Sequence, residues 1–469
     1  MRKKKIFENI EIEEFAAEGK TLAHVDGKVI FIKGGAPGDV VDVRVTNKRK
    51  SFFEGVPLKF HKYSSIRIDP SCEHFGTCGG CKWQHVPYET QLSFKQQQVI
   101  DNFERLGKFE IPESKPIMGS VEEEFYRNKL EYTFSDSRWL TQEEIDTGVE
   151  LERNALGFHI PGRFDKILNI EKCYLQPEPS NKIRNWVREY ALENNISFFN
   201  IREQVGFLRN LIIRTSTLGQ TMVILQVHED KPELTEPLLS KLNDDFDITS
   251  LNYVVNTKKN ETFSDLEIIN FSGKPFIEEK MSLNGTKESL TFRIGPKSFY
   301  QTNSKQAEQL YRRVSELAQI KADDTVYDLY TGTGTIANFI AHQAQKVVGL
   351  EYVPEAIEDA KVNSEINNIT NTEFFAGDIK DLLNRDFIDN HGKPDVIITD
   401  PPRAGMHPSV VRMLNEVKAN KIVYVSCNPA TQARDISELS ELYNVVEFQP
   451  VDMFPHTHHV ENIVLLNLK

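Results

Sequence analysis

Short runs of alternating hydrophobic and polar residues open the chain. They predict four strands, over Ile10–Glu14, Leu22–Val25, Val29–Lys33 and Val40–Val45. Asp26-Gly27, Gly34-Gly35 and Pro37-Gly38 separate these runs. An Asp-Gly pair between alternating runs is a strong hairpin signal. Several short strands at this spacing therefore indicate a small β-barrel over residues 1–63.

The pattern between residues 64 and 289 is mixed. Helices are predicted over Tyr88–Leu106, Asn181–Glu193 and Glu233–Leu242, and strands over Leu130–Phe134 and Met222–Val227. The acidic stretches Glu122–Glu124 and Asp244–Asp247 are expected in surface loops. Residues 64–289 are therefore expected to form a central α+β domain.

From about residue 290, apolar strands alternate with helical segments. The predicted strands are Thr325–Tyr330, Lys346–Leu350, Thr372–Phe375, Asp395–Thr399, Lys421–Val425 and, last, Ile463–Leu466, and a helix is predicted from Pro354 to Asn367. Such alternation is typical of a parallel sheet with crossover helices. The prediction for residues 290–469 is a doubly wound, Rossmann-like α/β domain.

The charge of the chain is unevenly distributed. The 469 residues have a net charge of −13, which by itself argues against a polyanionic partner. Residues 1–63, however, carry a net +4, and residues 44–67 a net +6 with Phe52, Phe53, Phe60 and Tyr63 interleaved. Because basic residues contact phosphates and aromatic rings stack on bases, segment 44–67 is a candidate RNA-binding surface on an OB-type barrel. The alternative is a solvated strand edge with phenylalanines in the core.

Neither a membrane span nor a signal peptide is expected. No run approaches the ~18–20 consecutive apolar residues of a membrane helix, and no apolar segment follows the basic start Met1–Lys5. The five cysteines are an odd number with clustered spacing. They favour a reducing cytoplasm, with thiols used for metal binding or catalysis rather than for disulfides.

A glycine-rich turn is expected to bind a nucleoside at the end of the first parallel strand. Asp328-Leu-Tyr-Thr-Gly-Thr-Gly-Thr335 follows this strand, and Glu351 ends the next one. Glycines let the backbone approach a ligand, and a carboxylate about 20 residues later suits the two hydroxyls of a ribose. The spacing leaves a dinucleotide and S-adenosylmethionine both open. Asp378 is placed to contact an adenine amino group, or else caps a helix.

Two further motifs follow predicted strands, Asp400-Pro-Pro-Arg-Ala-Gly405 and Ser426-Cys427-Asn428-Pro429. The carboxyl ends of parallel strands form the ligand crevice of such sheets, so Asp400 and Cys427 are expected there. Arg403 stands where amino-group methyltransferases use an aromatic residue, which argues against that chemistry. The terminal His456-Thr-His-His-Val-Glu461 segment is not favoured as a metal site, because His458 and His459 are adjacent.

Cys427 and Glu461 together suit methylation of a pyrimidine carbon. Carbon 5 of uracil becomes nucleophilic once a thiolate adds to carbon 6, and Cys427 could supply that thiolate. A base must later remove the proton from carbon 5, and Glu461 could serve. Taken alone, Glu461 is more often a solvated surface acid.

Four cysteines form a separate constellation. Cys72-x5-Cys78-Gly-Gly-Cys81 is followed much later by Cys173. Four thiolates can hold zinc or an iron–sulfur cluster, and the spacing favours neither. It does not match the C-x3-C-x2-C spacing of radical S-adenosylmethionine enzymes.

The chain resembles the class I S-adenosylmethionine-dependent RNA (uracil-5-)-methyltransferases. Phe299-Tyr-Gln301-Thr-Asn303, the Asp400 and Cys427 motifs and His459-Val-Glu461 match four family motifs in order. The resemblance is to the subgroup with an N-terminal TRAM domain and a 4Fe-4S cluster, of the 23S rRNA type. It covers almost the whole chain, with the TRAM-like barrel at residues 1–63. Thr331 and Thr335 depart from residues common in relatives.

The resemblance implies specific roles for residues of this chain. Cys427 would be the nucleophile and Glu461 the proton-abstracting base. Positions that would bind S-adenosylmethionine are Gln301, Tyr330, Thr335, Glu351, Asp378 and Asp400. The cluster would be held by Cys72, Cys78, Cys81 and Cys173, with a structural or RNA-positioning role.

The implied substrate is a uridine that leaves its stack to reach Cys427. Within the family the target lies in 23S ribosomal RNA or in the T-loop of transfer RNA, and 23S rRNA is favoured here. The barrel would hold flanking RNA through segment 44–67, and no stable protein partner is implied. A non-catalytic RNA-binding iron–sulfur protein is a distant alternative, which the presence of both Cys427 and Glu461 disfavours.

Overall fold

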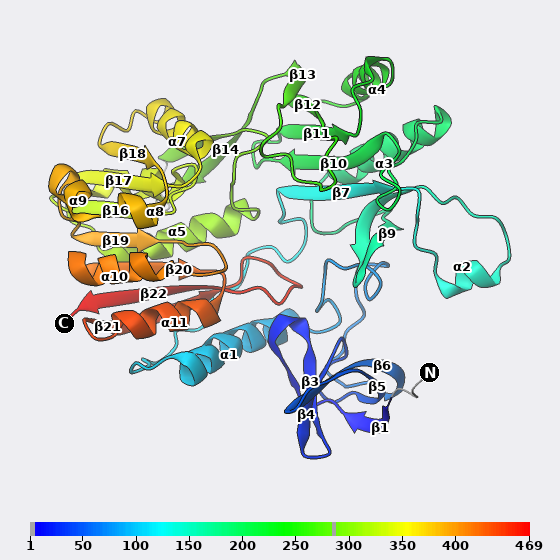
Figure 1. The fold of residues 1–469 in the computed structure, drawn as a ribbon, viewed down its shortest axis with the longest axis horizontal. Helices are drawn as coiled ribbons and strands as arrows, with labels where there is room; N and C mark the ends of the chain where they lie inside the picture. Colours follow the sequence, from blue (N-terminus) through cyan, green and yellow to red (C-terminus); the bar gives the residue numbers. More distant parts are fainter. Residues whose placement is uncertain (1–4, 284–287) are drawn as a thin grey trace.

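The computed structural model describes residues 5–283 and 288–469 (Figure 1). The first four residues of the predicted barrel and residues 284–287 of the predicted central domain lie outside the described residues. Three large sheets, following one another along the chain, and a two-stranded hairpin organise the described residues. None of the helices in the described residues combines the length and apolar character that a membrane crossing requires.

The N-terminal sheet has the strand order β1-β5-β6-β4-β3-β2. Its strands are β1 (Ile6–Glu11), β2 (Glu14–Phe15), β3 (Thr21–Val25), β4 (Lys28–Ile32), β5 (Val40–Lys48) and β6 (Phe52–Lys62), and a 3-10 turn, η1, spans Ala17–Gly19. The segment 6–15 pairs with β5 through β1 and with β3 through β2, so one bent segment joins both edges of the sheet. Apolar side chains at alternating positions fill its interior, Phe53 among them. The predicted strands Leu22–Val25, Val29–Lys33 and Val40–Val45 are present, whereas the predicted strand Ile10–Glu14 is divided between the end of β1 and the start of β2. The alternation pattern did not predict β6.

The central sheet has the order β13-β12-β11-β10-β7-β8-β9. Its strands are β7 (Lys129–Ser135), β8 (Ala155–Ile160), β9 (Arg163–Asn169), β10 (Leu208–Thr215), β11 (Thr221–Val227), β12 (Ser250–Val255) and β13 (Ile269–Gly273), and its helices are α2 (Gln142–Asp146), α3 (Ser180–Glu193) and α4 (Pro232–Asp245). One expectation was wrong: Asp244 and Asp245 form the last turn of α4 rather than a loop. Asp245 accepts hydrogen bonds from Lys241 and Trp186, which tie the end of α4 to α3.

The C-terminal sheet has the order β18-β17-β16-β19-β20-β22-β21. Its strands are β16 (Thr325–Leu329), β17 (Lys346–Glu351), β18 (Thr372–Ala376), β19 (Val396–Thr399), β20 (Lys421–Ser426), β21 (Tyr443–Val451) and β22 (Glu461–Leu468). The first five are parallel and β22 is antiparallel to both neighbours. The predicted doubly wound α/β architecture is present. The strand order reverses between β16 and β19, and such a reversal opens a ligand crevice at the carboxyl ends of the strands.

Helices cover both faces of this C-terminal sheet (Figure 1). They are α5 (Ser304–Ala318), α6 (Thr335–Ile340), α7 (Pro354–Ile366), α8 (Ile379–Leu382), α9 (Arg385–His391), α10 (Pro408–Val417) and α11 (Pro429–Leu439), with a 3-10 turn η2 (Ala341–Gln343). Helix α1 (Tyr88–Leu106), which comes from the central range of the sequence, lies beside α11, where its Val99 and Phe103 join the core of the C-terminal sheet. The hairpin β14 (Ile277–Ser282) and β15 (Ser289–Ile294) also packs against helices of the C-terminal sheet. Residues of the range 64–289 thus contribute to more than one core.

Candidate active site

A cavity of about 1100 Å³ opens at the carboxyl ends of β16, β17, β19 and β20. It brings together six of the predicted site residues from distant parts of the sequence: Gln301, Tyr330, Glu351, Asp400, Cys427 and Glu461. Thr335 and Asp378 do not line it. The reason is topological: five of the six end, follow or begin a strand whose end faces the crevice, and Gln301 comes from the segment between β15 and α5.

The turn after β16 is held by two carboxylates. Buried Asp328 accepts hydrogen bonds from Thr331 Oγ1 at 2.5 Å and from the Ala337 amide at 3.1 Å, and burial raises the pKa of Asp328 to about 7. Glu351 accepts from the Gly332 amide at 3.1 Å across the crevice. Gly334 has φ +74°, and a Cβ there would come within 2.8 Å of Ala360, so this turn requires glycine. The turn is therefore rigid where a nucleoside would lie.

Thr335 and Asp378 are engaged away from the cavity. The Thr335 hydroxyl lies 3.3 Å from the Tyr311 hydroxyl, at the buried start of α6. Asp378 caps α8 by accepting from the Lys380 amide, and it also forms an ion pair with the Lys380 side chain. The structure thus shows Asp378 as a helix cap, and its contact with adenine remains a proposal.

Cys427 occupies the short turn between β20 and α11. Asn428 caps α11 by accepting from the Ala430 amide, and its side chain donates to the Arg403 carbonyl at 2.9 Å. Thr431 donates to the same carbonyl, so the loop that carries Asp400 and Arg403 is fastened to the start of α11. This arrangement holds the thiol and the Asp400 loop together at the mouth of the crevice.

The electrostatics of the thiol are dominated by burial. Burial, then the carboxyls of Glu461 and Asp400, raise the pKa of Cys427 to about 11, whereas Arg403 opposes the rise by charge and hydrogen bonding. Burial also raises the pKa of Glu461 and of Asp400 well above the ordinary carboxyl range, and the charge of Asp400 adds to the rise at Glu461. The three groups line one cavity, and both carboxyls act on the thiol through their charge.

Among the cavity residues that were not predicted as site residues are Arg403, Phe299, Tyr352, Phe454 and His459. Phe299 and Tyr352 are each 68% exposed, unusual for large aromatic side chains. Phe299 begins one of the family motifs and Tyr352 directly follows Glu351, and these positions were the available signal. His459 is neutral at physiological pH, because burial and the nearby charges of His458 and Arg403 lower its pKa to about 3.

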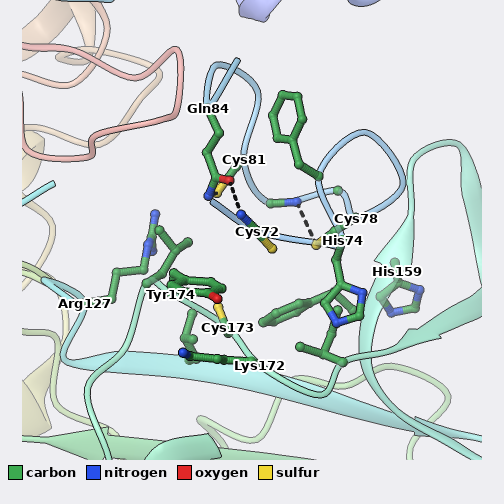
Figure 2. Close-up of a pocket in the computed structure, with 17 residues that line it drawn as sticks. Cys72, His74, Cys78, Cys81, Gln84, Arg127, His159, Lys172, Cys173 and Tyr174 are labelled. Atoms are coloured by element: carbon green, nitrogen blue, oxygen red, sulfur yellow. Dashed lines mark hydrogen bonds between the residues drawn. The ribbon is translucent and has the colours of Figure 1, made fainter. Parts of the chain in front are cut away.

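The four predicted cluster cysteines line a second cavity of about 380 Å³ (Figure 2). Cys72, Cys78 and Cys81 come from one loop, and Cys173 faces them from the segment after β9. Side-chain and backbone donors reach two of the sulfurs, namely Gln84 Nε2 to Cys81 and the Gly80 amide to Cys78, each at 3.4 Å. Within residues 5–283 and 288–469, no three His, Cys, Asp or Glu side chains stand as a ready site for a single metal ion.

Only part of the basic segment 44–67 is free to meet a ligand. Arg67 makes a two-pronged ion pair with buried Asp39, at 2.8 and 2.6 Å, and is therefore structural. Phe53 belongs to the barrel core, as the alternative interpretation expected. Phe60 and Tyr63 stack on each other with ring centroids 5.1 Å apart, and Tyr63 is 63% exposed. The exposed Lys59 and Lys62 neighbour this pair, whereas the exposed Lys48, Arg49 and Lys50 lie at the β5–β6 turn, at the other end of the hairpin.

Comparison with known proteins decides the family. Residues 214–469 match the tRNA (uracil-5-)-methyltransferase family, and residues 8–58 match the TRAM domain. The chain belongs to the tRNA (uracil-5-)-methyltransferase family. It is an S-adenosylmethionine-dependent RNA uracil-5-methyltransferase with an N-terminal TRAM domain.

Two relatives and one solved structure cover nearly the full length of this methyltransferase. An uncharacterized RNA methyltransferase of Bacteroides thetaiotaomicron is 56% identical over 97% of this chain and 100% of its own. One from Porphyromonas gingivalis is 52% identical over 97% and 99%. The tRNA (uracil-54, C5)-methyltransferase of Pyrococcus abyssi, solved with S-adenosyl-L-homocysteine, is 31% identical with a TM-score of 0.75, covering 98% of this chain and all of its own.

Proposed function

We propose that this enzyme methylates carbon 5 of a specific uridine through a covalent adduct with Cys427. One observation carries the proposal: Cys427, Asp400 and Glu461 come from three separate strand ends and line the same cavity. Their proximity also has an electrostatic effect, since each carboxyl raises the pKa of the thiol. A thiol and a base facing one space are what addition to uracil followed by proton removal requires.

The proposed reaction begins when the Cys427 thiol loses its proton to the facing carboxylate of Asp400, so that Glu461 stays ionised for the last step. The sulfur bonds to carbon 6, and the carbon 5–carbon 6 π electrons move onto the carbon 4 oxygen as an enolate. Carbon 5 then bonds to the methyl carbon of S-adenosylmethionine, whose sulfur–methyl bond breaks to leave S-adenosylhomocysteine. Glu461 as carboxylate removes the carbon 5 proton, the double bond re-forms, and the thiolate leaves.

For the co-substrate we propose contacts from Gln301, Tyr330, Glu351 and Asp400, all of which line the catalytic cavity. Thr335 and Asp378 remain proposed members of this set, acting from the rim. The Glu351 carboxylate already accepts from the Gly332 and Val353 amides, which fixes it beside the turn after β16. A carboxylate has about four lone-pair positions, so a ribose hydroxyl can still donate to it.

We also propose that Cys72, Cys78, Cys81 and Cys173 hold a 4Fe-4S cluster. The donor set fits, because the four thiols surround a common cavity. Zinc is the other group that four thiolates hold, and the resemblance in the sequence favours the cluster over zinc. Gly79 leaves the loop room, since a Cβ there would approach the His159 carbonyl oxygen to 2.9 Å. When bound, the cluster would supply structural cross-linking, and none of the methyl-transfer steps passes through it.

The RNA proposed as substrate is 23S rRNA, and the T-loop of tRNA is the second candidate. Support for the tRNA candidate comes from the Pyrococcus abyssi enzyme, a tRNA (uracil-54, C5)-methyltransferase that covers 98% of this chain. In either case we propose that the barrel holds flanking RNA through the Phe60–Tyr63 stack and its exposed basic neighbours. The barrel is anchored to α1 and to the segment before it, since Phe15 contacts Trp83 and Phe94 with ring centroids 5.2 and 4.3 Å apart.

Two linked experiments test the proposal. The first maps 5-methyluridine in ribosomal and transfer RNA from a strain that lacks the gene. Loss of one 23S rRNA site is expected, whereas loss confined to the T-loop of tRNA would replace the substrate and leave the chemistry intact. The second supplies the purified enzyme with radiolabelled S-adenosylmethionine and the identified RNA. Cys427→Ala should bind this RNA normally but transfer no methyl group, and retained turnover would refute the covalent mechanism.

A further inference from the structure

The loop 452–460 joins β21 to β22 and delivers three residues to the catalytic cavity. Phe454 and His459 lie within it, and Glu461 follows directly as the first residue of β22. Glu461 is 5% exposed and its position depends on where this loop ends. The contacts that fix the loop come from outside the C-terminal sheet.

The buried face of helix α1 is polar in its first half and apolar in its second half. Gln91, Lys95, Val99 and Phe103 are its buried side chains, and their three- and four-residue spacing places them on one stripe. Val99 and Phe103 pack into the core of the C-terminal sheet. The polar half of the stripe, preceded by Tyr88, instead faces the loop 452–460. Burying polar groups is costly unless they are paired, so this half has a specific set of partners.

Lys95 and Asp452 form a fully buried ion pair. Their side chains have 0% exposure, and Lys95 Nζ lies 2.6 Å from Asp452 Oδ1. Lys95 also donates to the Phe454 carbonyl at 3.0 Å, and Asp452 Oδ1 accepts from the Phe454 amide at 2.9 Å. Tyr88 donates to the other oxygen of Asp452 at 2.9 Å. Hydrogen bonds to both the carbonyl and the amide of Phe454 thus fix the start of the loop.

A second set of contacts holds the middle of the loop. His456 has φ +65°, a left-handed conformation that is rare for a bulky residue and persists only where its surroundings impose it. Gln91 supplies the first constraint, since its Oε1 accepts from the His456 amide at 2.9 Å. The Lys82 and Trp83 amides donate to the His456 carbonyl at 2.7 and 3.1 Å. The same loop is therefore tied to α1 and to the chain segment directly after Cys81.

A buried ion pair contributes little net stability, because desolvation offsets the attraction between the charges. Its best-attested benefit is that it admits only one geometry. Here that geometry sets the path of a nine-residue loop ending at Glu461. Ordinary apolar packing would hold the loop less specifically, since apolar contacts are not directional.

We propose that Lys95, through Asp452, is a positioning residue for the proton-abstraction step, a role that rests on Glu461 being the base. Lys95 touches neither the cavity nor the reacting atoms. It fixes the start of the loop 452–460, and the loop in turn fixes the Glu461 carboxylate relative to carbon 5. Displacement of a reacting group by about 1 Å from a remote mutation can cost about a hundredfold in rate.

The test uses the full-length enzyme and the double variant K95M/D452N. This change removes both charges, while the asparagine oxygen can still accept from the Phe454 amide. We expect kcat to fall about ten- to a hundredfold, with KM for RNA and for S-adenosylmethionine within about twofold. We also expect a methylated, covalent protein–RNA adduct to accumulate on denaturing gels, because only elimination is slowed. If the double variant fails to fold, Y88F, which loses one bond to Asp452, should show the same pattern more weakly.

The matched control is R202M/D165N, which removes an ion pair of 2.8 Å beside the central sheet. It should keep wild-type kcat and accumulate no adduct. E461Q is measured alongside and should also accumulate adduct. If E461Q accumulates adduct and K95M/D452N does not, the positioning role is refuted while Glu461 stands as base. If E461Q itself accumulates none, the base assignment fails, and the positioning role falls with it. A change in KM with kcat unaltered would also refute the positioning role.

Discussion

Replacing Glu461 by glutamine is expected to separate the two halves of the reaction. Glutamine keeps the size of the side chain but cannot accept the carbon 5 proton. Loss of a positioned general base typically costs about 10²–10⁴-fold, which corresponds to about 2.7–5.4 kcal/mol in the barrier. Elimination should therefore become rate-limiting in E461Q, and the methylated adduct of Cys427 with RNA should accumulate. Wild-type enzyme should show little adduct in steady state.

The same substitution should make Cys427 of the free enzyme more reactive. Glu461 is one of the two carboxyls that raise the pKa of this thiol to about 11, so its removal should lower that pKa. A lower pKa means more thiolate at a fixed pH, since the thiolate fraction changes about tenfold per pKa unit. Alkylation of Cys427, followed by peptide mass spectrometry at pH 8, should then be faster in E461Q than in wild type.

Elimination of the adduct is expected to become faster as the pH rises. Burial raises the pKa of Glu461, so the carboxylate needed for elimination appears only at a pH above the ordinary range for glutamate. The elimination rate of the wild-type adduct should rise with pH through that raised pKa, whereas in E461Q the rise should vanish. Glu438→Gln, a change at an exposed carboxyl on α11, is the control and should leave both profiles unaltered. Free RNA as the sole species in E461Q, or slower alkylation of Cys427, would refute the reasoning.

Two further predictions concern the cysteine cavity and the barrel. Cys173→Ser removes one of four proposed ligands, so enzyme purified without oxygen should lose the iron–sulfur absorbance near about 400 nm; an unchanged spectrum would exclude Cys173 as a ligand. Lys59 and Lys62 are exposed beside the Phe60–Tyr63 stack, so K59A/K62A should flatten the dependence of log Kobs on log salt by about 1.4, given about 0.7 per contact to single-stranded phosphate. Lys241→Ala on α4 is the matched loss of an exposed lysine, and an equal slope in both variants would contradict RNA binding at this face.

Local patterns in the sequence predicted many of the helices and strands. The boundaries of α1 agree with prediction because its apolar stripe repeats at helical spacing over five turns. The C-terminal strands were predictable because parallel strands buried on both faces are continuous apolar runs. Strand β6 was missed because exposed lysines interrupt its pattern, and β21 because its register shifts midway.

The catalytic motifs were recognisable because each follows a strand end, and strand ends share one edge of the sheet. The sequence by itself thus indicated the family, the N-terminal barrel, the C-terminal α/β sheet and a candidate nucleophile and base. Thr335 and Asp378 show the limit of this reasoning, since both follow the right strands yet direct their side chains to local partners. Whether a short polar side chain caps a helix or faces a ligand depends on a rotamer that sequence spacing does not set.

Only the tertiary structure decided which distant residues meet. Lys95 and Asp452 are 357 positions apart, and no local pattern signals their ion pair, which exists because α1 packs beside α11 and β21. The net charge of segment 44–67 is a second example. Arg67 contributes to this charge in the sequence, but Asp39 neutralises Arg67 in the fold. Local patterns fix what each segment can become, because backbone and side-chain preferences act over a few residues. Pairing of buried charges and the shape of a cavity depend on contacts between segments, and these form only once the chain has folded.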